Sequence, residues 1–190
     1  MMSILLFLVL ALPLLAGAGL PSRAQTADDQ PLCFDQHSEL ESRIANCTRL
    51  LIQKGLDAIE QAKIYSNRGV AFGQNGESKR AIVDLDRALQ LKPNDPAILN
   101  NRCYFLAVTG QTRKALEDCD AALRLQQPTA TMFDSRGYAH LRAGHLDLAL
   151  KDYNAALQLD PGYASALWGR GLVRHRTGDA ARSADDFEAA

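Results

Sequence analysis

Apolar and small residues recur at an interval of 34 residues along most of the chain, from about residue 62 to the last residue. Within each interval the apolar positions have helical spacing, and a glycine divides them into two runs. The dividing glycines are Gly76, Gly110, Gly144 and Gly178. Glycine adopts the left-handed backbone that closes a helix, and a proline stops the next one. The prolines that follow the second runs are Pro93, Pro128 and Pro161. Each interval therefore predicts two helices joined by a tight turn.

A further helix is predicted upstream of the repeats, over residues 38–56. Its apolar residues have helical spacing before a glycine, and they are Leu40, Ile44, Cys47 and Leu51. We interpret this helix as part of a degenerate leading unit that caps the array. The next helix is expected to begin at Asp57, whose side chain can cap backbone amides while Glu60 reaches back.

These positions resemble the tetratricopeptide repeat family, whose helix-turn-helix unit has about 34 residues. The first unit matches at Tyr65, Gly69, Phe72, Ala81, Leu85, Ala88 and Pro93, and the third at Phe133, Gly137, Ala149, Tyr153, Ala156 and Pro161. The resemblance implies an all-α, right-handed α-solenoid with units at 62–95, 96–129, 130–163 and, incomplete, 164–190. The second unit departs from the pattern because Cys103 replaces a small glycine and Pro128 comes one place late.

Residues 1–24 have the pattern of a secretory signal. Residues 4–20 are apolar and uncharged, and small residues at Ser22 and Ala24 predict cleavage after Ala24. Residues 25–37 would then be a polar tether. A retained membrane anchor is the alternative, because this apolar run, which contains Pro13, is at the short limit of a span. The expected location is the periplasm or the extracellular space, with membrane contact only if the signal segment is retained.

Composition argues against several other classes of protein. With 47% apolar residues and a net charge of −1, the chain has an ordinary globular composition. Nucleic acid is not an expected partner, because its binders normally carry a basic patch. The sequence has no glycine-rich phosphate loop, GxSxG, HExxH or CxxC motif. We therefore expect no enzyme activity, small-molecule substrate, cofactor or metal.

An arginine recurs in each first helix, and an aspartate follows it at a constant spacing in the second helix. The arginines are Arg68, Arg102, Arg136 and Arg170, and the aspartates are Asp84, Asp118, Asp152 and Asp186. Because each hairpin turns midway between them, the two positions lie at similar heights. The spacing predicts four ion pairs, within or between neighbouring units. An identical residue in every unit usually serves the unit, so we expect a structural role.

The four cysteines predict two disulfide bonds. Cys103 and Cys119 lie eight residues before and after Gln111, so they face each other across the hairpin at about 5 Å between Cα atoms. Pairing of Cys33 with Cys47 follows by elimination. Buried free thiols are the alternative. A thiol redox protein is another, and it would need Cys103 and Cys119 to be exposed and reactive.

In the family, first helices line the concave face of the solenoid and bind extended or helical peptides. The family's groove pattern falls on Asn100, Tyr104, Val108, Asp134, Tyr138, Leu141, Arg142, Trp168, Leu172, His175 and Arg176. This surface would suit a peptide with one or two apolar anchors and an acidic flank. For Trp168, packing between units is the alternative. The family's chaperone-binding members grip a terminal carboxylate, and of those positions only Asn101 matches here, so that function is not expected.

The sequence thus predicts an exported scaffold that binds a partner protein or peptide through its concave groove. The fourth unit stops before its closing turn and no capping helix follows. A solenoid needs its last apolar face covered, so either the chain is a fragment or a partner covers this end. A regulatory region of a larger envelope enzyme or complex is therefore an alternative function.

Overall fold

The computed structural model describes residues 32–190, and the predicted signal segment lies outside this range. Every regular element between residues 32 and 190 is helical, as the sequence predicted. Within the same range no helix is both long and apolar enough to cross a membrane. The fold is therefore all-α over the whole of the described chain.

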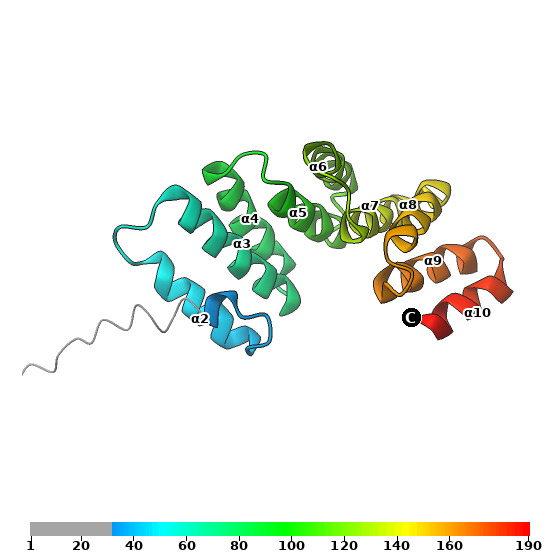
Figure 1. The fold of residues 1–190 in the computed structure, drawn as a ribbon, viewed down its shortest axis with the longest axis horizontal. Coiled ribbons are helices and arrows are strands. Elements are labelled where there is room, and N and C mark those ends of the chain that lie inside the picture. The colour runs from blue at the N-terminus through cyan, green and yellow to red at the C-terminus, as the bar shows by residue number, and fades with distance from the viewer. Residues whose placement is uncertain (1–31) are drawn as a thin grey trace, which may run out of the picture.

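The helices pair into hairpins that stack in chain order, with α2 and α10 at opposite ends of an elongated, arched array (Figure 1). The leading helix is α2 (Leu40–Leu51). The first helices of the four units are α3 (Ala58–Gln74), α5 (Pro96–Val108), α7 (Ala130–Ala143) and α9 (Ala164–Arg176). The second helices are α4 (Ser78–Leu91), α6 (Thr112–Leu125), α8 (Leu146–Leu159) and α10 (Ala180–Ala189). Each helix contacts the next one along the chain, as expected of an α-solenoid.

The helix ends follow the local sequence signals. The side chain of Asp57 accepts a hydrogen bond from the Glu60 amide at 2.8 Å, and Glu60 accepts one from the Asp57 amide at 3.1 Å. This reciprocal pair starts α3 at the expected place. The glycine after each first helix has φ between +80° and +84°, which is the left-handed conformation that reverses the chain within each unit.

Small residues let the two helices of a unit approach closely. A Cβ atom added to the glycine of the first helix would lie between 2.6 and 3.2 Å from the large side chain opposite. The pairs are Gly69 with Leu85, Gly137 with Tyr153, and Gly171 with Phe187. In the second unit a disulfide between Cys103 and Cys119 takes the same place, with 5.5 Å between Cα atoms. In the second unit a disulfide bond thus takes the place of the contact between a glycine and a large side chain that the other units have.

The second disulfide joins Cys33 to Cys47, with 4.9 Å between Cα atoms, and ties the start of the described chain to α2. All four cysteines are buried. A redox role for Cys103 and Cys119 required exposed, reactive sulfurs, so burial removes the basis of that alternative.

Each repeated arginine contacts the predicted aspartate of its own unit. The closest nitrogen–oxygen distances are 2.7 Å for Arg68–Asp84, 2.6 Å for Arg102–Asp118, 2.7 Å for Arg136–Asp152 and 2.6 Å for Arg170–Asp186. All four aspartates are buried. The four arginine–aspartate ion pairs that the repeat spacing predicted are therefore confirmed.

Each arginine after the first also reaches the second helix of the preceding unit, 16 residues earlier in the chain. These contacts are Arg102–Asp86 at 2.7 Å, Arg136–Asp120 at 2.9 Å and Arg170–Asn154 at 3.1 Å. We call each such three-helix contact an arginine junction. The pairing is thus both within and between units, which the sequence had left open.

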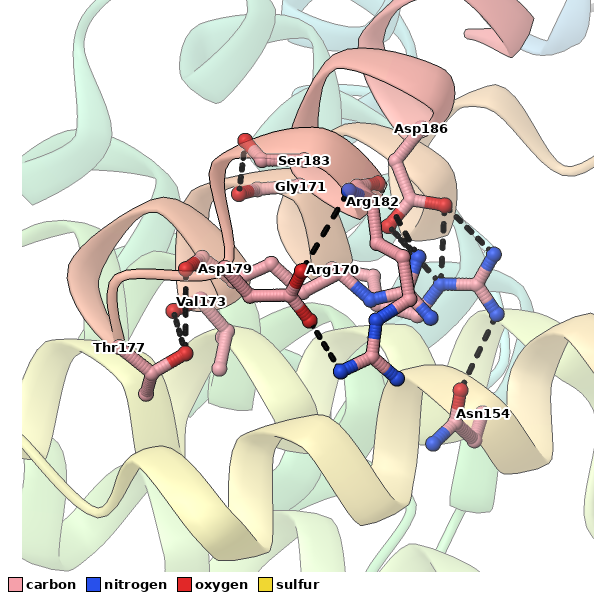
Figure 2. Close-up of polar contacts among 10 residues, drawn as sticks. Asn154, Arg170, Gly171, Val173, Thr177, Asp179, Arg182, Ser183 and Asp186 are labelled. Carbon is pink, nitrogen blue, oxygen red and sulfur yellow. Dashed lines mark hydrogen bonds and ion pairs between the residues drawn. The ribbon is translucent and has the colours of Figure 1, made fainter.

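The junction of the fourth unit has a different charge arrangement (Figure 2). Its contact with the preceding unit is the neutral amide of Asn154. Asp186 instead accepts from a second arginine, because Arg174 Nη1 lies 2.7 Å from Asp186 Oδ2. The same close-up shows Ser183 donating its hydroxyl to the Gly171 carbonyl at 2.9 Å, which ties α10 to α9.

Gly73 is expected to be intolerant of a side chain, because α5 packs against it. An added Cβ would lie 2.0 Å from the buried Phe105 ring. For Gly73→Ala, overpacking costs about 1–3 kcal/mol. Improved helix propensity offsets about 1 kcal/mol of that cost, and because the clash with the ring is severe, we expect a net loss of about 1–2 kcal/mol. Unfolding in guanidinium chloride, followed by circular dichroism, would measure this change in the free energy of unfolding. Lys63→Ala, at an exposed position of the same helix, should leave stability almost unchanged; equal stability of both variants would contradict the packing argument.

Candidate peptide-binding groove

The first helices of the units lie next to one another and form one continuous face. Helix α5 contacts both α3 and α7, and α7 contacts α9. Two cavities open along this face, with volumes of about 340 Å³ and about 170 Å³. Both are lined by Tyr104, Asp134 and Ser165, so they form one groove that turns around Asp134.

The groove extends across all four first helices. The larger cavity begins at Val70 and Gln74 of α3 and includes Asn101, Thr131 and Ser135. The smaller cavity ends at Trp168 and Leu172 of α9. We refer to this surface, from Val70 to Leu172, as the groove.

Aromatic side chains border the groove and remain accessible. Tyr104 is 40% exposed and Trp168 is 54% exposed. The rings of Tyr104 and Tyr138 lie 5.4 Å apart, so α5 and α7 present a joint aromatic surface. The Trp168 ring contacts Phe187 of its own unit at 4.7 Å between centroids. That contact leaves half of Trp168 open to a ligand and does not bury it between units.

Three residues that the sequence assigned to the groove line its cavities from a buried position at the floor. Asn100 and Asp134 are each 6% exposed, and Leu141 is 3% exposed. Leu141 belongs to the apolar core between the third and fourth units, because it packs with Ala166 and Leu167 of α9. Leu141 therefore lines the smaller cavity from the buried core and has little exposed surface of its own.

The basic residues lie toward one edge of the groove. Arg142 is exposed in the last turn of α7, where it donates to the Tyr138 hydroxyl at 3.1 Å and the Val108 carbonyl at 3.4 Å. His175 and Arg176 are exposed in the last turn of α9. None of these three basic residues lines either cavity, so the basic character lies outside the two cavities, in the last turns of α7 and α9.

Several lining residues were not assigned to the groove from the sequence, and Tyr153, Tyr163 and Ser165 are among them. Tyr153 comes from a second helix, yet its ring reaches the groove. It passes between Gly137 and Gly169, where an added Cβ would lie 3.1 Å and 2.3 Å from the ring. These two glycines, in consecutive first helices, were a visible signal that a large side chain needs room on both sides.

The electrostatic centre of the groove is Asp134. Its Oδ2 atom accepts a hydrogen bond from Ser165 Oγ at 2.9 Å. Burial raises the pKa of Asp134 to about 6, although the Ser165 bond opposes this shift. Burial also raises the pKa of Tyr104 and of Tyr163, and the negative charge of Asp134 adds to both shifts. The carboxylate is thus surrounded by phenols that are neutral at physiological pH.

A second acceptor at the floor is unpaired. Asn100 Oδ1 is buried and has no hydrogen-bond partner among residues 32–190. Asn100 lines the larger cavity together with Asp134. A buried acceptor without a donor is costly, so the floor presents two oxygen acceptors to any ligand that can donate N–H groups.

Sequence models of the tetratricopeptide repeat match two parts of the chain, residues 62–95 and residues 137–178. The chain therefore contains tetratricopeptide repeats. The matches fall on the first unit and on the border of the third and fourth units, where the helix pairs and their glycine turns have the described geometry. No curated protein sequence matches the chain.

Solved tetratricopeptide repeat structures have the same fold. MamA from Desulfovibrio magneticus is similar with a TM-score of 0.67 and 19% identity, over 85% of this chain and 88% of that chain. The TPR domain of Arabidopsis OM64 is similar with a TM-score of 0.58 and 19% identity, over 63% of this chain and 98% of that chain. The first TPR of Spaghetti (RPAP3), bound to the HSP90 peptide SRMEEVD, is similar with a TM-score of 0.57 and 22% identity, over 63% of this chain and 95% of that chain. At these identities the similarity establishes the fold.

Proposed function

We propose that this tetratricopeptide repeat protein is an exported scaffold that holds a segment of a partner protein in its groove. The observation that carries the proposal is the aromatic surface of the exposed Tyr104 and Trp168 and the half-buried Tyr138 along one continuous groove. Aromatic side chains in such positions supply much of the binding energy at protein interfaces. The solved structure of a similar fold with a bound peptide supports this use of the fold.

The groove suits an extended segment with apolar anchors. Trp168 and Leu172 offer apolar contact at one end, and Val70 offers it at the other. An acidic residue of the partner would find Arg142 or Arg176 at the basic edge. The partner class we propose is therefore a protein or peptide, and not a nucleic acid or a small-molecule substrate.

Export to an oxidising compartment is supported by two independent features. One is the signal-like pattern of residues 1–24, and the other is the pair of buried disulfides. Disulfides form and persist in secreted and periplasmic proteins, whereas cytosolic thiols are kept reduced. We therefore propose the periplasm or the extracellular space as the location.

A non-catalytic role accords with the groove's residues. Its titratable groups are one carboxylate and several phenols, and no pair of them has the acid–base geometry of a known catalytic site within the described chain. If the chain is part of a larger envelope enzyme or complex, the groove would serve as its docking region for the same kind of segment.

Site-specific crosslinking should identify the partner and test the groove. A photoreactive phenylalanine at Tyr138 is expected to capture one defined protein in the native compartment, because Tyr138 lines the groove. The matched control is the same group at Val83, which is 66% exposed on the second helix α4. Capture of the same protein from both positions would contradict a groove-specific contact.

Binding to the purified partner should then depend on the aromatic border. Tyr104→Ala is expected to raise the dissociation constant about thirtyfold, which corresponds to about 2 kcal/mol for an aromatic hot spot. Isothermal titration calorimetry gives the measurement, and circular dichroism checks that the variant is folded. An unchanged dissociation constant would refute the proposed function.

A further inference from the structure

We propose that Asp134 and the aromatic rings around it form a site for a positively charged side chain, lysine or arginine, of the bound segment. This inference rests on the proposed function, since it assumes that the groove holds a polypeptide. It names the residue type that the centre of the groove selects.

Asp134 differs from the other buried aspartates of the repeats. Asp84, Asp118, Asp152 and Asp186 each have an arginine partner within 2.7 Å. Asp134 is equally buried, yet within residues 32–190 no cationic side chain forms an ion pair with it, and its one hydrogen-bond donor is the Ser165 hydroxyl. A buried carboxylate is normally paired, because desolvation penalises an unpaired charge. The missing cation is the one that a ligand would bring.

The walls of the cavity suit an organic cation. Tyr104, Tyr138 and Trp168 line the same cavity as Asp134. The faces of aromatic rings attract ammonium and guanidinium groups, and this attraction is strongest where water is excluded. Together with the carboxylate at the floor, these rings provide both of the contacts that a buried lysine or arginine head group needs.

The size of the cavity favours a single side chain over a free ligand. Its volume is about 170 Å³, whereas pockets for small molecules and cofactors usually have about 300–1,000 Å³. The adjoining cavity, about 340 Å³ in volume, continues the groove past Asn100 and Asn101. A side chain in the smaller cavity would therefore leave the peptide backbone in the larger one.

The unpaired Asn100 oxygen is an independent indication of the same kind of ligand. Asn100 lines the larger cavity, and its buried Oδ1 atom has no donor among residues 32–190. A backbone N–H of the bound segment, or an N–H group of an arginine, would satisfy it. The floor of the groove thus offers acceptors at two adjoining points, and a donor-rich segment fits both.

Neighbouring charges leave the site negative. The groups that face Asp134 are Tyr104 from α5, Tyr138 on its own helix, Tyr153 from α8, and Tyr163 before α9. All four are phenols, and the raised pKa values of Tyr104, Tyr153 and Tyr163 keep these three uncharged at neutral pH. Arg142 lies two turns further along α7, is exposed, and bonds to the Tyr138 hydroxyl. A bound segment is therefore expected to place its basic residue at Asp134 and any acidic residue toward Arg142.

The direct test uses short capped peptides and the fluorescence of Trp168, which is the single tryptophan of the chain. The probes are acetyl-Ala-Lys-Ala-amide and acetyl-Ala-Arg-Ala-amide, with the norleucine peptide as the uncharged control at equal ionic strength. We expect a saturable change with at least one basic peptide and a response at least tenfold weaker with norleucine. Equal responses to the basic and norleucine peptides would overturn the proposal.

Asp134→Asn removes the charge and keeps the shape, so it should weaken binding of the basic peptides at least tenfold. Asp147→Asn is the matched control, because it removes one exposed carboxylate from α8 and should leave binding unchanged. Unfolding midpoints of the two variants show whether either loss reflects folding. In the parent protein the signal should also be lost as the pH falls below about 6, where Asp134 takes up a proton. Unchanged binding by a folded Asp134→Asn variant would refute the site.

Two further outcomes separate this inference from the proposed function. Free butylammonium binding as tightly as the lysine peptide would show a site for small amines, which would overturn the assignment to a peptide side chain. With the purified partner, weak binding by Tyr104→Ala but unchanged binding by Asp134→Asn would leave the groove function intact and reject the cation site. Weakened binding by both variants would support both conclusions.

Discussion

Replacing Arg136 with methionine is expected to lower the free energy of unfolding by about 3–5 kcal/mol. The guanidinium holds Asp152 in the same unit and Asp120 in the preceding one. Methionine would leave the Asp152 carboxylate, whose side chain is 4% exposed, buried without its cation. Removing one partner of a buried pair costs more than the pair contributes, because the remaining charge stays desolvated. Unfolding in guanidinium chloride, monitored by circular dichroism, would measure the loss of stability.

The second partner of Arg136 provides the control. The Asp120 side chain is 47% exposed, so water already solvates its charge. Asp120→Asn should therefore cost less than about 1 kcal/mol. A loss for Asp120→Asn as large as that for Arg136→Met would mean that burial does not determine the strength of the junction.

The pH dependence of the methionine variant tests the same explanation. His140 Nε2 lies 3.9 Å from Asp152 Oδ2, and burial, together with the nearby Arg136, lowers the pKa of His140. Without Arg136, His140 can take up a proton and partly replace the lost cation. Its folded-state pKa would then rise, so the stabilisation would be present at low pH and lost as pH rises. The deficit of the variant should be smaller at pH 5.5 than at pH 8.

Reduction of the central disulfide is expected to remove roughly 3 kcal/mol of stability, because Cys103 and Cys119 are 16 residues apart. In the chain-entropy model the bond restricts the unfolded chain, and a loop of this length gives about that value. The measurement compares unfolding midpoints of the protein with and without dithiothreitol. Mass spectrometry under non-reducing conditions checks that the bond is present in protein from the native compartment.

A double substitution separates the central bond from the one between Cys33 and Cys47. Cys103→Gly with Cys119→Leu restores the small-on-large pairing that Gly69 and Leu85 form in the first unit. This variant should fold without the central bond and keep the other. Reductant should then lower its stability by about 3 kcal/mol less than that of the parent. An equal effect on both proteins would contradict the assigned contribution.

The sequence predicted contacts within a unit well, because a hairpin with a fixed glycine turn determines which residues face each other. Arg136 with Asp152 and Cys103 with Cys119 both lie symmetrically about such a turn. Both the disulfide bond and the ion pair join the two helices of a single unit. One repeat, folded by its own turn, is enough to place them.

Contacts between units were harder to predict, because they depend on the angle at which one hairpin packs on the next. The second partners of the arginines, Asp86, Asp120 and Asn154, also recur at the interval of the repeat, and this recurrence was the available signal. Burial of Leu141 depends on the same packing angle, because α9 covers it. A helical pattern shows which face a residue is on, but not how deep the next helix covers that face.

The isolation of Asp134 could not be predicted for a related reason. Its equivalents in the other units are Ser66, Asn100 and Trp168, so the repeat supplies no partner at this position. Ser165 reaches it from the next unit, Tyr104 lines the same cavity from the preceding unit, and Tyr153 lines it from between Gly137 and Gly169. Three units contribute to this one carboxylate, and only their assembled positions show that it lacks a cation.

Asn154 gives the three arginine junctions unequal responses to salt. The first two link neighbouring units through opposite charges at half-exposed aspartates, whereas the third links them through a neutral amide. Electrostatic screening acts over about 8 Å at physiological ionic strength and about 3 Å at 1 M salt. The first two links between units are therefore expected to weaken as salt rises, whereas the third should change less. Concentrated salt should therefore loosen the packing between the units that carry Val70 and Asn101 more than the packing of the unit that carries Trp168.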